Sequence, residues 1–290
     1  MKRNYLIFIA SLVLFGSNGI VAERISLESH QVVMLRTFIG TAFLAAPLIA
    51  RRRTPAVLRD RRSLALLTAS GLSMGASWLF LYEAYRTVGV GISSLAYYCA
   101  PVIVMALSPW LFGERLAPAK IAGFCTVLAG ALLINLQADG GAESAWGLFC
   151  GWMSALAHAA MVVFSKKADQ VDGVESSAVQ LAASFLLAAA FTACQDDCAF
   201  RVAADEWPWA LMLGVVNTGL GCYGYFSSLG GLPAQTVAVL GYLEPLSAVV
   251  LAALLLHETM VPAQMLGAVL IVGGALASEL TARRRRPRPG

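Results

Sequence analysis

Long apolar stretches alternate with short polar segments along the whole chain. Each stretch holds roughly 18–22 residues, which at about 1.5 Å per helical residue is enough to cross a hydrocarbon core of about 30 Å. The pattern predicts ten membrane-spanning helices, at residues 5–22, 31–49, 64–82, 91–112, 119–136, 145–164, 176–193, 207–226, 236–256 and 263–280. We therefore expect an all-α integral membrane protein.

Composition supports the membrane assignment. Apolar residues make up 58% of the chain and charged residues 13%, against about 25% charged residues in soluble domains. A cleaved signal peptide is the alternative for the first stretch, because Lys2 and Arg3 precede it. No small-x-small cleavage site follows it and the chain continues into another apolar stretch, so we interpret it as a true helix.

The positions of the lysines and arginines predict the orientation. With the N-terminus in the cytoplasm, 17 of the 21 basic residues fall in cytoplasmic segments, among them six in "RRRTPAVLRDRR" and five in "RRRRPRP". This bias favours both termini in the cytoplasm and an even number of spans. We expect the protein to lie in a bacterial inner (plasma) membrane. The arginine tail adjoins a span, so binding to anionic lipid explains it better than nucleic-acid binding does.

One phrase occurs twice in the chain. Residues 97–118, "YYCAPVIVMALSPWLFGERLAP", match residues 241–262, "GYLEPLSAVVLAALLLHETMVP", and the extended alignment of 97–135 with 241–279 has eleven identities in 39 positions without a gap. The repeat gives each half five spans. Because five is odd, the second half starts on the opposite side of the membrane, so the two five-helix repeats are inverted. We expect repeats at 1–137 and 138–281 and a basic tail at 282–290.

These residues resemble a known family. The paired segments "PVIVMALSPWLFGERLAPAKIAG" and "EPLSAVVLAALLLHETMVPAQMLG", with "FGSNGIV", "LRTFIG" and "YEAYRTVGVGISSLAYYCAP", are similar to the EamA-like branch of the drug/metabolite transporter superfamily. The resemblance implies ten helices in two inverted repeats around a central cavity, and transport of small metabolites, often outward. Phe15 stands where many relatives place a tryptophan, and His158 holds the corresponding place in the second half.

A carboxylate near the middle of the ninth span is the first functional candidate. Glu244 would cost at least about 2.5–3.5 kcal/mol in hydrocarbon, so it must face a cavity or a partner, or be protonated. Pro245 leaves a backbone carbonyl free at a similar depth. We expect Glu244 to contact the substrate or a proton; the structural alternative is that it only caps freed backbone groups.

Other charged and polar residues inside the spans are also candidates. Arg36 and Glu83 lie near the outer side of two spans and would form either a gate or a salt bridge that holds helices together. His158 would carry protons or make an interhelical hydrogen bond. Asn18, in "GSNG", would contact the substrate or serve helix packing.

Aromatic residues supply the remaining candidates. Trp78 and Tyr82 lie one helical turn apart, and Tyr98, Tyr223 and Tyr242 lie deeper than the interfacial aromatic belt. A buried phenol needs a hydrogen-bond partner. A cavity lined by such residues would accept amphipathic or aromatic solutes and would bind an amine by cation–π contact.

An intramembrane hydrolase is the alternative from a different class. "GLSMG" at 71–75 matches the nucleophile elbow G-x-S-x-G around Ser73, but it lies within an apolar stretch, where small residues spaced by four indicate helix packing. Three histidines and no phosphate-binding loop give no metal or cofactor site. Cys194 and Cys198 flank a predicted outer loop and would form a local disulfide or remain two thiols.

Together these features predict a secondary transporter of small metabolites. We expect it to export amino acids or related amphipathic compounds by alternating access, driven by their gradient or by protons as the coupling ion. Import of a nutrient or amine on the same scaffold is the alternative. The expected partners are a small-molecule substrate and the lipid bilayer, with the protein a monomer or a homodimer.

Overall fold

The computed structural model describes residues 2–50, 55–135, 145–168, 171–195, 201–255 and 262–284. The first half holds α1 (Lys2–Gly16), α2 (Asn18–Ala22), α3 (Ser29–Ala50), η1 (Ala56–Arg59), α4 (Arg61–Tyr97), α5 (Ala100–Phe112) and α6 (Pro118–Asn135). The second half holds α7 (Ala145–Lys167), α8 (Gly173–Cys194), α9 (Trp207–Leu211), η2 (Met212–Leu220), α10 (Gly221–Leu229), α11 (Ala234–Gly241), α12 (Leu243–Leu255) and α13 (Pro262–Arg284). These residues form helices and short connections, without strands. The predicted tail beyond residue 284 lies outside the described residues.

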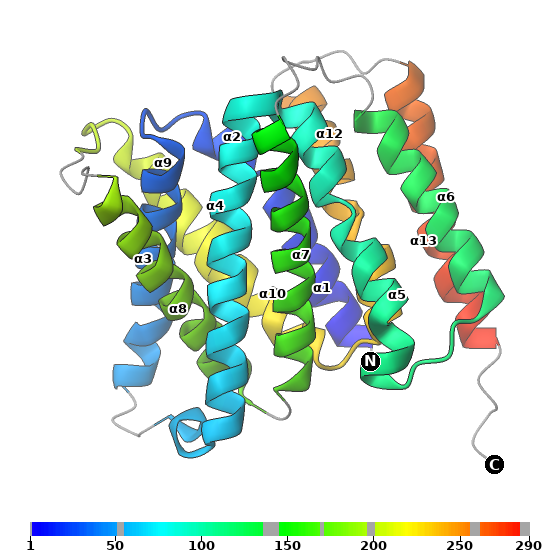
Figure 1. Cartoon of the computed structure of the whole chain (residues 1–290), viewed down its shortest axis with the longest axis horizontal. Helices are drawn as coiled ribbons and strands as arrows, with labels where there is room; N and C mark the ends of the chain where they lie inside the picture. The colour runs from blue at the N-terminus through cyan, green and yellow to red at the C-terminus, as the bar shows by residue number, and fades with distance from the viewer. Residues whose placement is uncertain are drawn as a thin grey trace.

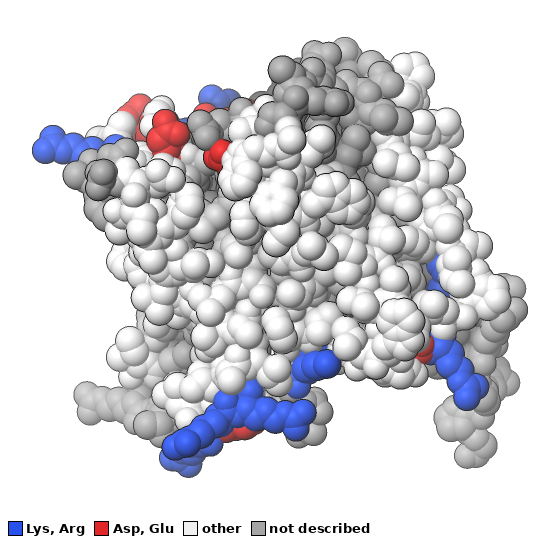
Figure 2. Space-filling model, viewed as in Figure 1, with Lys and Arg blue, Asp and Glu red and all other residues white. Residues whose placement is uncertain are grey.

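The described helices suit a membrane. Five segments are long and apolar enough to cross one: Ser29–Ala50, Arg61–Ala84, Ala145–Lys167, Gly173–Cys194 and Ala234–Leu255. Large apolar side chains point outward, among them Leu6 at 69% exposure and Ile49 at 74%. In Figure 2 the middle of the visible face is almost free of charge, and most blue lysines and arginines lie at one end. An apolar outer surface is expected where lipid replaces water as the solvent.

Three of the expected spans are broken rather than continuous. The first breaks at Ser17 between α1 and α2, and the ninth breaks at Tyr242 between α11 and α12. The fourth breaks after Tyr97, where α4 ends, and resumes in α5. Pro101 and Pro245 lie in the first turn of α5 and α12, where a proline's missing N–H leaves no helical bond unmade. A hydrophobic count cannot detect such breaks, because both sides of each are apolar.

The eighth span also differs from a regular α-helix. Its middle, η2, is a π-helix of nine residues. The Thr218 hydroxyl donates to the carbonyl of Leu213, five residues earlier, at 2.7 Å. π-helical turns are rare and occur frequently at functional sites.

The long helices pack side by side with roughly parallel axes (Figure 1). α4 packs along α7 and α8, α3 along α8, and α1 along α10 and α12, while α6 and α13 form a pair at one edge. α1 begins and α13 ends at the same end of the molecule (Figure 1). Most charged residues seen at that end in Figure 2 are basic.

Glycines set the closest helix contacts. A Cβ at Gly71 of α4 would overlap the backbone of Gln180 in α8, and one at Gly75 would lie 3.0 Å from the Ser184 hydroxyl. "GLSMG" is therefore a packing face in the interior of a long helix. The strand-to-helix turn that a nucleophilic Ser73 requires is not present there, so the hydrolase alternative loses its structural basis.

The pair α6 and α13 makes a reciprocal contact. A Cβ at Gly130 would lie 2.6 Å from the Gly267 carbonyl, and one at Gly274 would lie 2.8 Å from the Gly123 carbonyl. Gly123 and Gly130 align with Gly267 and Gly274 in the sequence repeat. Gly130 thus contacts the counterpart of Gly123, and Gly123 contacts the counterpart of Gly130. The two helices therefore run antiparallel, as in contacts related by a two-fold axis.

Charged side chains fix the turn between α10 and α11 at the basic end of the molecule. The Glu114 carboxylate accepts hydrogen bonds from the N–H groups of Ala234 at 2.6 Å and Gln235 at 3.1 Å, which start α11. Lys120 donates to the Thr236 hydroxyl at 3.1 Å, and Lys166 donates to the Leu232 carbonyl. Glu114 and Lys120 therefore join the two halves at this end, whereas the Lys166 hydrogen bond lies within the second half.

A glycine substitution tests the α4–α8 contact. We predict that Gly71→Ala lowers the free energy of unfolding by about 1–3 kcal/mol, because the added methyl collides with backbone. Gly273→Ala is the matched control, since a Cβ there meets nothing within 4 Å. Thermal unfolding in detergent measures both, and equal melting temperatures for the two variants would contradict this packing.

Candidate functional site

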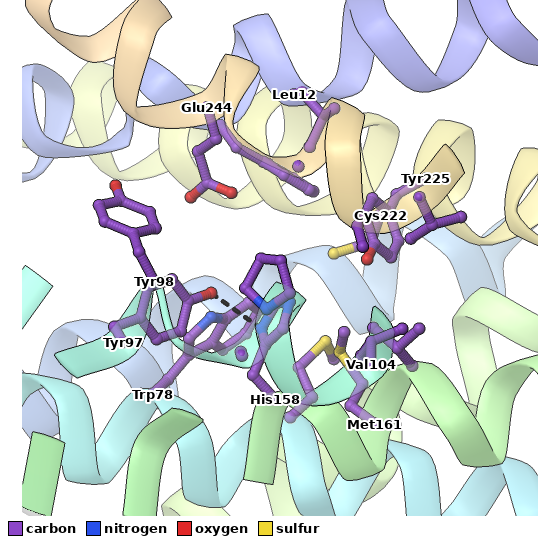
Figure 3. Close-up of a pocket in the computed structure, with 18 of the residues that line it drawn as sticks. Leu12, Trp78, Tyr97, Tyr98, Val104, His158, Met161, Cys222, Tyr225 and Glu244 are labelled. Atoms are coloured by element: carbon purple, nitrogen blue, oxygen red, sulfur yellow. Dashed lines mark hydrogen bonds between the residues drawn. The ribbon is translucent and has the colours of Figure 1, made fainter. Parts of the chain in front are cut away.

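A cavity lies between the two halves, next to the helix breaks. Its empty volume is about 800 Å³, its opening included, and twenty residues from α1, α2, α4, α5, α7, α10, α11 and α12 line it. Most of the lining is apolar or aromatic, with a few polar groups (Figure 3).

Glu244 supplies the carboxylate of the cavity. It lies in the first turn of α12, just after the break at Tyr242, and its side chain points into the cavity (Figure 3). The Ser247 hydroxyl donates to the Glu244 carbonyl at 2.8 Å, and Gly16 of α1 packs directly against Ser247. The break therefore aims the carboxylate inward. The positive end of the α12 dipole favours a negative charge at this position.

Aromatic groups from the first half face Glu244 across the cavity. Trp78, Tyr97 and Tyr98 line this wall, together with His158 of α7 (Figure 3). The Tyr97 hydroxyl and His158 Nδ1 share a hydrogen bond of 2.8 Å. The Tyr97 and Tyr98 rings meet edge to face with centroids 5.5 Å apart. Such a wall offers ring faces to a cation or to an apolar side chain.

Tyr242 lies behind this wall rather than on it. Its side chain is fully buried, and its hydroxyl donates to the Tyr98 carbonyl at 2.7 Å. The expectation that it lines the cavity therefore does not agree with its position. Tyr98 and Tyr242 are equivalent in the sequence repeat, so the two halves meet here through matching residues.

The break between α1 and α2 is held by an asparagine of the π-helix. Asn217 donates to the Leu14 carbonyl at 3.1 Å and to the Ser17 hydroxyl at 2.8 Å. The break turns Asn18 toward the cavity, which it lines. Among the described residues, the side-chain oxygens of Asn18 and Asn217 are buried without a hydrogen-bond partner.

Arg36 and Glu83 have different partners, so the pair expected from their similar depth is not formed. The Arg36 guanidinium, at 3% exposure, donates from Nε to the Thr218 hydroxyl at 2.9 Å and lies 4.6 Å from the centre of the Trp78 ring. Glu83 accepts a hydrogen bond from Trp146 at 3.2 Å. Equal depth in two helices does not set the direction in which each side chain points.

The candidates from the sequence divide into two groups. Five line the cavity: Asn18, Trp78, Tyr98, His158 and Glu244. Tyr82 and Glu83 line a separate pocket with Glu28 and His30, and Tyr223 is 39% exposed on α10. The predicted partner of Cys194, Cys198, lies outside the described residues, so their disulfide stays a prediction.

Some lining residues were not predicted. Tyr97, Phe15 and Cys222 line the cavity, and the sequence repeat contains a signal for Cys222. At the shift of the repeat, Trp78 aligns with Cys222, and Ala100 aligns with Glu244. All four of these residues line the cavity. Projecting each candidate onto the other half would therefore have found more of the site.

The sequence itself decides the family. The model of the EamA-like transporter family matches residues 2–136 and again residues 145–279. The chain belongs to the EamA-like transporter family. It is accordingly a multi-pass membrane protein that transports small molecules and is not an enzyme.

Relatives of this EamA-like protein include named exporters. The "Probable amino-acid metabolite efflux pump" of Salmonella typhimurium is 28% identical, with 98% of this chain and 97% of the relative covered. The "Aromatic amino acid exporter YddG" of Ancylobacter novellus is 27% identical over 71% of this chain and 72% of the relative. A crystal structure at 22% identity has a TM-score of 0.82 and covers 97% of this chain and 99% of its own, which shows the shared fold.

A double-mutant cycle tests the polar link in the aromatic wall. We predict that Tyr97→Phe and His158→Phe are coupled by about 0.5–1.5 kcal/mol, the usual contribution of one hydrogen bond. Free energies of unfolding in mixed micelles measure the single and double variants. Strictly additive losses would show that the 2.8 Å contact contributes nothing to stability.

Proposed function

We propose that this protein is a secondary transporter that exports amino acids or related amphipathic compounds by alternating access. The observation that carries the proposal is the cavity, in which one carboxylate, Glu244, faces an aromatic wall at the meeting point of broken helices. Broken helices around a midplane site are common in secondary transporters. The two named exporters among the relatives support amino acids as the substrate class.

The architecture that we propose has ten crossings in two inverted halves, 1–137 and 138–281. The reciprocal contact of α6 with α13 and the meeting of Tyr98 with Tyr242 support the inversion. Both termini face the cytoplasm of a bacterial inner membrane. The gathering of basic residues at the end where α1 begins supports this orientation.

Alternating access then follows from the contacts between the halves. Glu114 and Lys120 of the first half bind the start of α11 in the second half at the basic end. Opening this end toward the cytoplasm requires these hydrogen bonds to break, and the other end must then close. A substrate favours the transition only as far as it binds the two states differently.

Within the cavity, Glu244 contacts the ammonium of the substrate or a coupling proton. A cation held beside a carboxylate and over aromatic rings gains both charge pairing and cation–π attraction in a site with little water. The aromatic wall accepts an apolar or aromatic side chain. The cavity thus suits a compound that joins a cationic group to an apolar one.

Counterflow in liposomes tests this function. We predict that the reconstituted wild-type protein exchanges labelled phenylalanine, leucine or methionine saturably. Glu244→Gln should lower exchange at least about tenfold if the carboxylate binds the ammonium, since a charged hydrogen bond contributes about 1.5–3 kcal/mol. If Glu244 instead carries the coupling proton, the variant should keep counterflow and lose accumulation driven by a pH gradient.

A second carboxylate provides the control for this experiment. Glu175→Gln removes a carboxylate that binds the N–H groups of Ala56 and Val57, outside the cavity, and should leave exchange unchanged. The proposal would be contradicted by folded wild-type protein that exchanges none of the three amino acids. An equal loss in Glu175→Gln and Glu244→Gln would remove the specific role of Glu244.

A further inference from the structure

A buried cation lies beside the cavity and has no part in the function proposed above. Arg36 is 3% exposed and contacts Thr218 through Nε and the face of Trp78 at 4.6 Å. Among the described residues, its Nη2 is buried without a hydrogen-bond acceptor. A guanidinium keeps its charge at every physiological pH and offers five N–H donors, so this arrangement leaves part of its binding capacity unused.

The surroundings of Arg36 hold it in a fixed orientation. Thr218 lies in the π-helix, and its hydroxyl hydrogen goes to the Leu213 carbonyl at 2.7 Å. The Thr218 oxygen can therefore only accept from Arg36, which fixes the Nε side of the guanidinium. Packing against the Trp78 ring fixes its plane. The remaining donors are thus pre-organised, which lowers the entropy cost of binding an anion.

Trp78 connects this guanidinium to the cavity. The indole lines the cavity and also contacts Arg36, so a shift of one side chain would bring the arginine into contact with a bound solute. Arg36 and Glu244 therefore place one positive and one negative group around the same cavity without direct pairing.

We propose that Arg36 binds the carboxylate of an α-amino acid while Glu244 binds its ammonium, so that the cavity selects zwitterions over simple amines. The inference rests on the proposed function and specifies the substrate class of the same site. Planar guanidinium groups match carboxylates through two parallel hydrogen bonds. Bound carboxylate would replace the Trp78 ring as the partner of Arg36, which couples substrate recognition to a movement of Trp78.

Competition in the counterflow assay tests this inference. Labelled phenylalanine is exchanged against unlabelled phenylalanine, phenylalaninamide or phenethylamine, the last two of which lack the carboxylate. We expect wild-type protein to prefer phenylalanine over each of the other two compounds at least about tenfold, because removing one partner of a buried charged pair costs at least that much affinity. In Arg36→Gln the preference should fall to nearly one while exchange of phenethylamine persists. Arg36→Lys should be intermediate, because an ammonium lacks the planar fork.

A matched arginine serves as the control. Arg24 lies 5.8 Å from the centre of the Trp209 ring on an exposed segment, so Arg24→Gln removes a similar arginine–tryptophan contact and should keep the full preference. An Arg36→Gln or Arg36→Lys protein that loses exchange of all three compounds equally would make Arg36 purely structural and would overturn the inference. Wild-type protein that exchanges no amino acid would instead overturn the proposed function itself.

Discussion

Every helix break inside hydrocarbon must find polar partners within the protein, and this requirement governs the structure. No lipid can satisfy a free N–H or C=O group, so each break needs its own donor or acceptor. At the break beside Ser17, the Asn217 side chain donates a hydrogen bond to the Leu14 carbonyl. At the break after Tyr97, the Tyr242 hydroxyl donates to the Tyr98 carbonyl. At the start of α12, the Ser247 hydroxyl donates to the Glu244 carbonyl. The cavity lies where these breaks converge. Irregular backbone at membrane depth is tolerated where it is buried in protein or lines a cavity.

The cavity is built from matching positions that carry different chemistry. Trp78 and its counterpart in the second half, Cys222, both line the cavity. Glu244 and its counterpart in the first half, Ala100, line it as well. The first half thus contributes most of the aromatic surface and the second half contributes the carboxylate. The two halves therefore share a scaffold at these positions and differ in the side chains that they bring to the cavity.

Much of the fold and part of the candidate site could be predicted from the sequence. The apolar stretches predicted helices because lipid requires apolar surface, and Glu244 stood out because a carboxylate in such a stretch is costly. Depth along a span does not give the side that a residue faces, so Tyr242 and Tyr223 were expected in the cavity and lie elsewhere. The same limit produced the expected pair of Arg36 with Glu83. The π-helix gave no signal, because its residues are as apolar as a regular span.

The central claim is that the cavity beside Glu244 holds the transported compound, and a heavy-atom substrate locates that compound directly. A crystal of the protein with 4-iodo-phenylalanine, a compound that it must also exchange in liposomes, would give an anomalous iodine peak. The account predicts the peak inside the cavity near Trp78 and Tyr97, with the amino-acid group toward Glu244. A peak elsewhere in the protein, with the cavity empty, would contradict it.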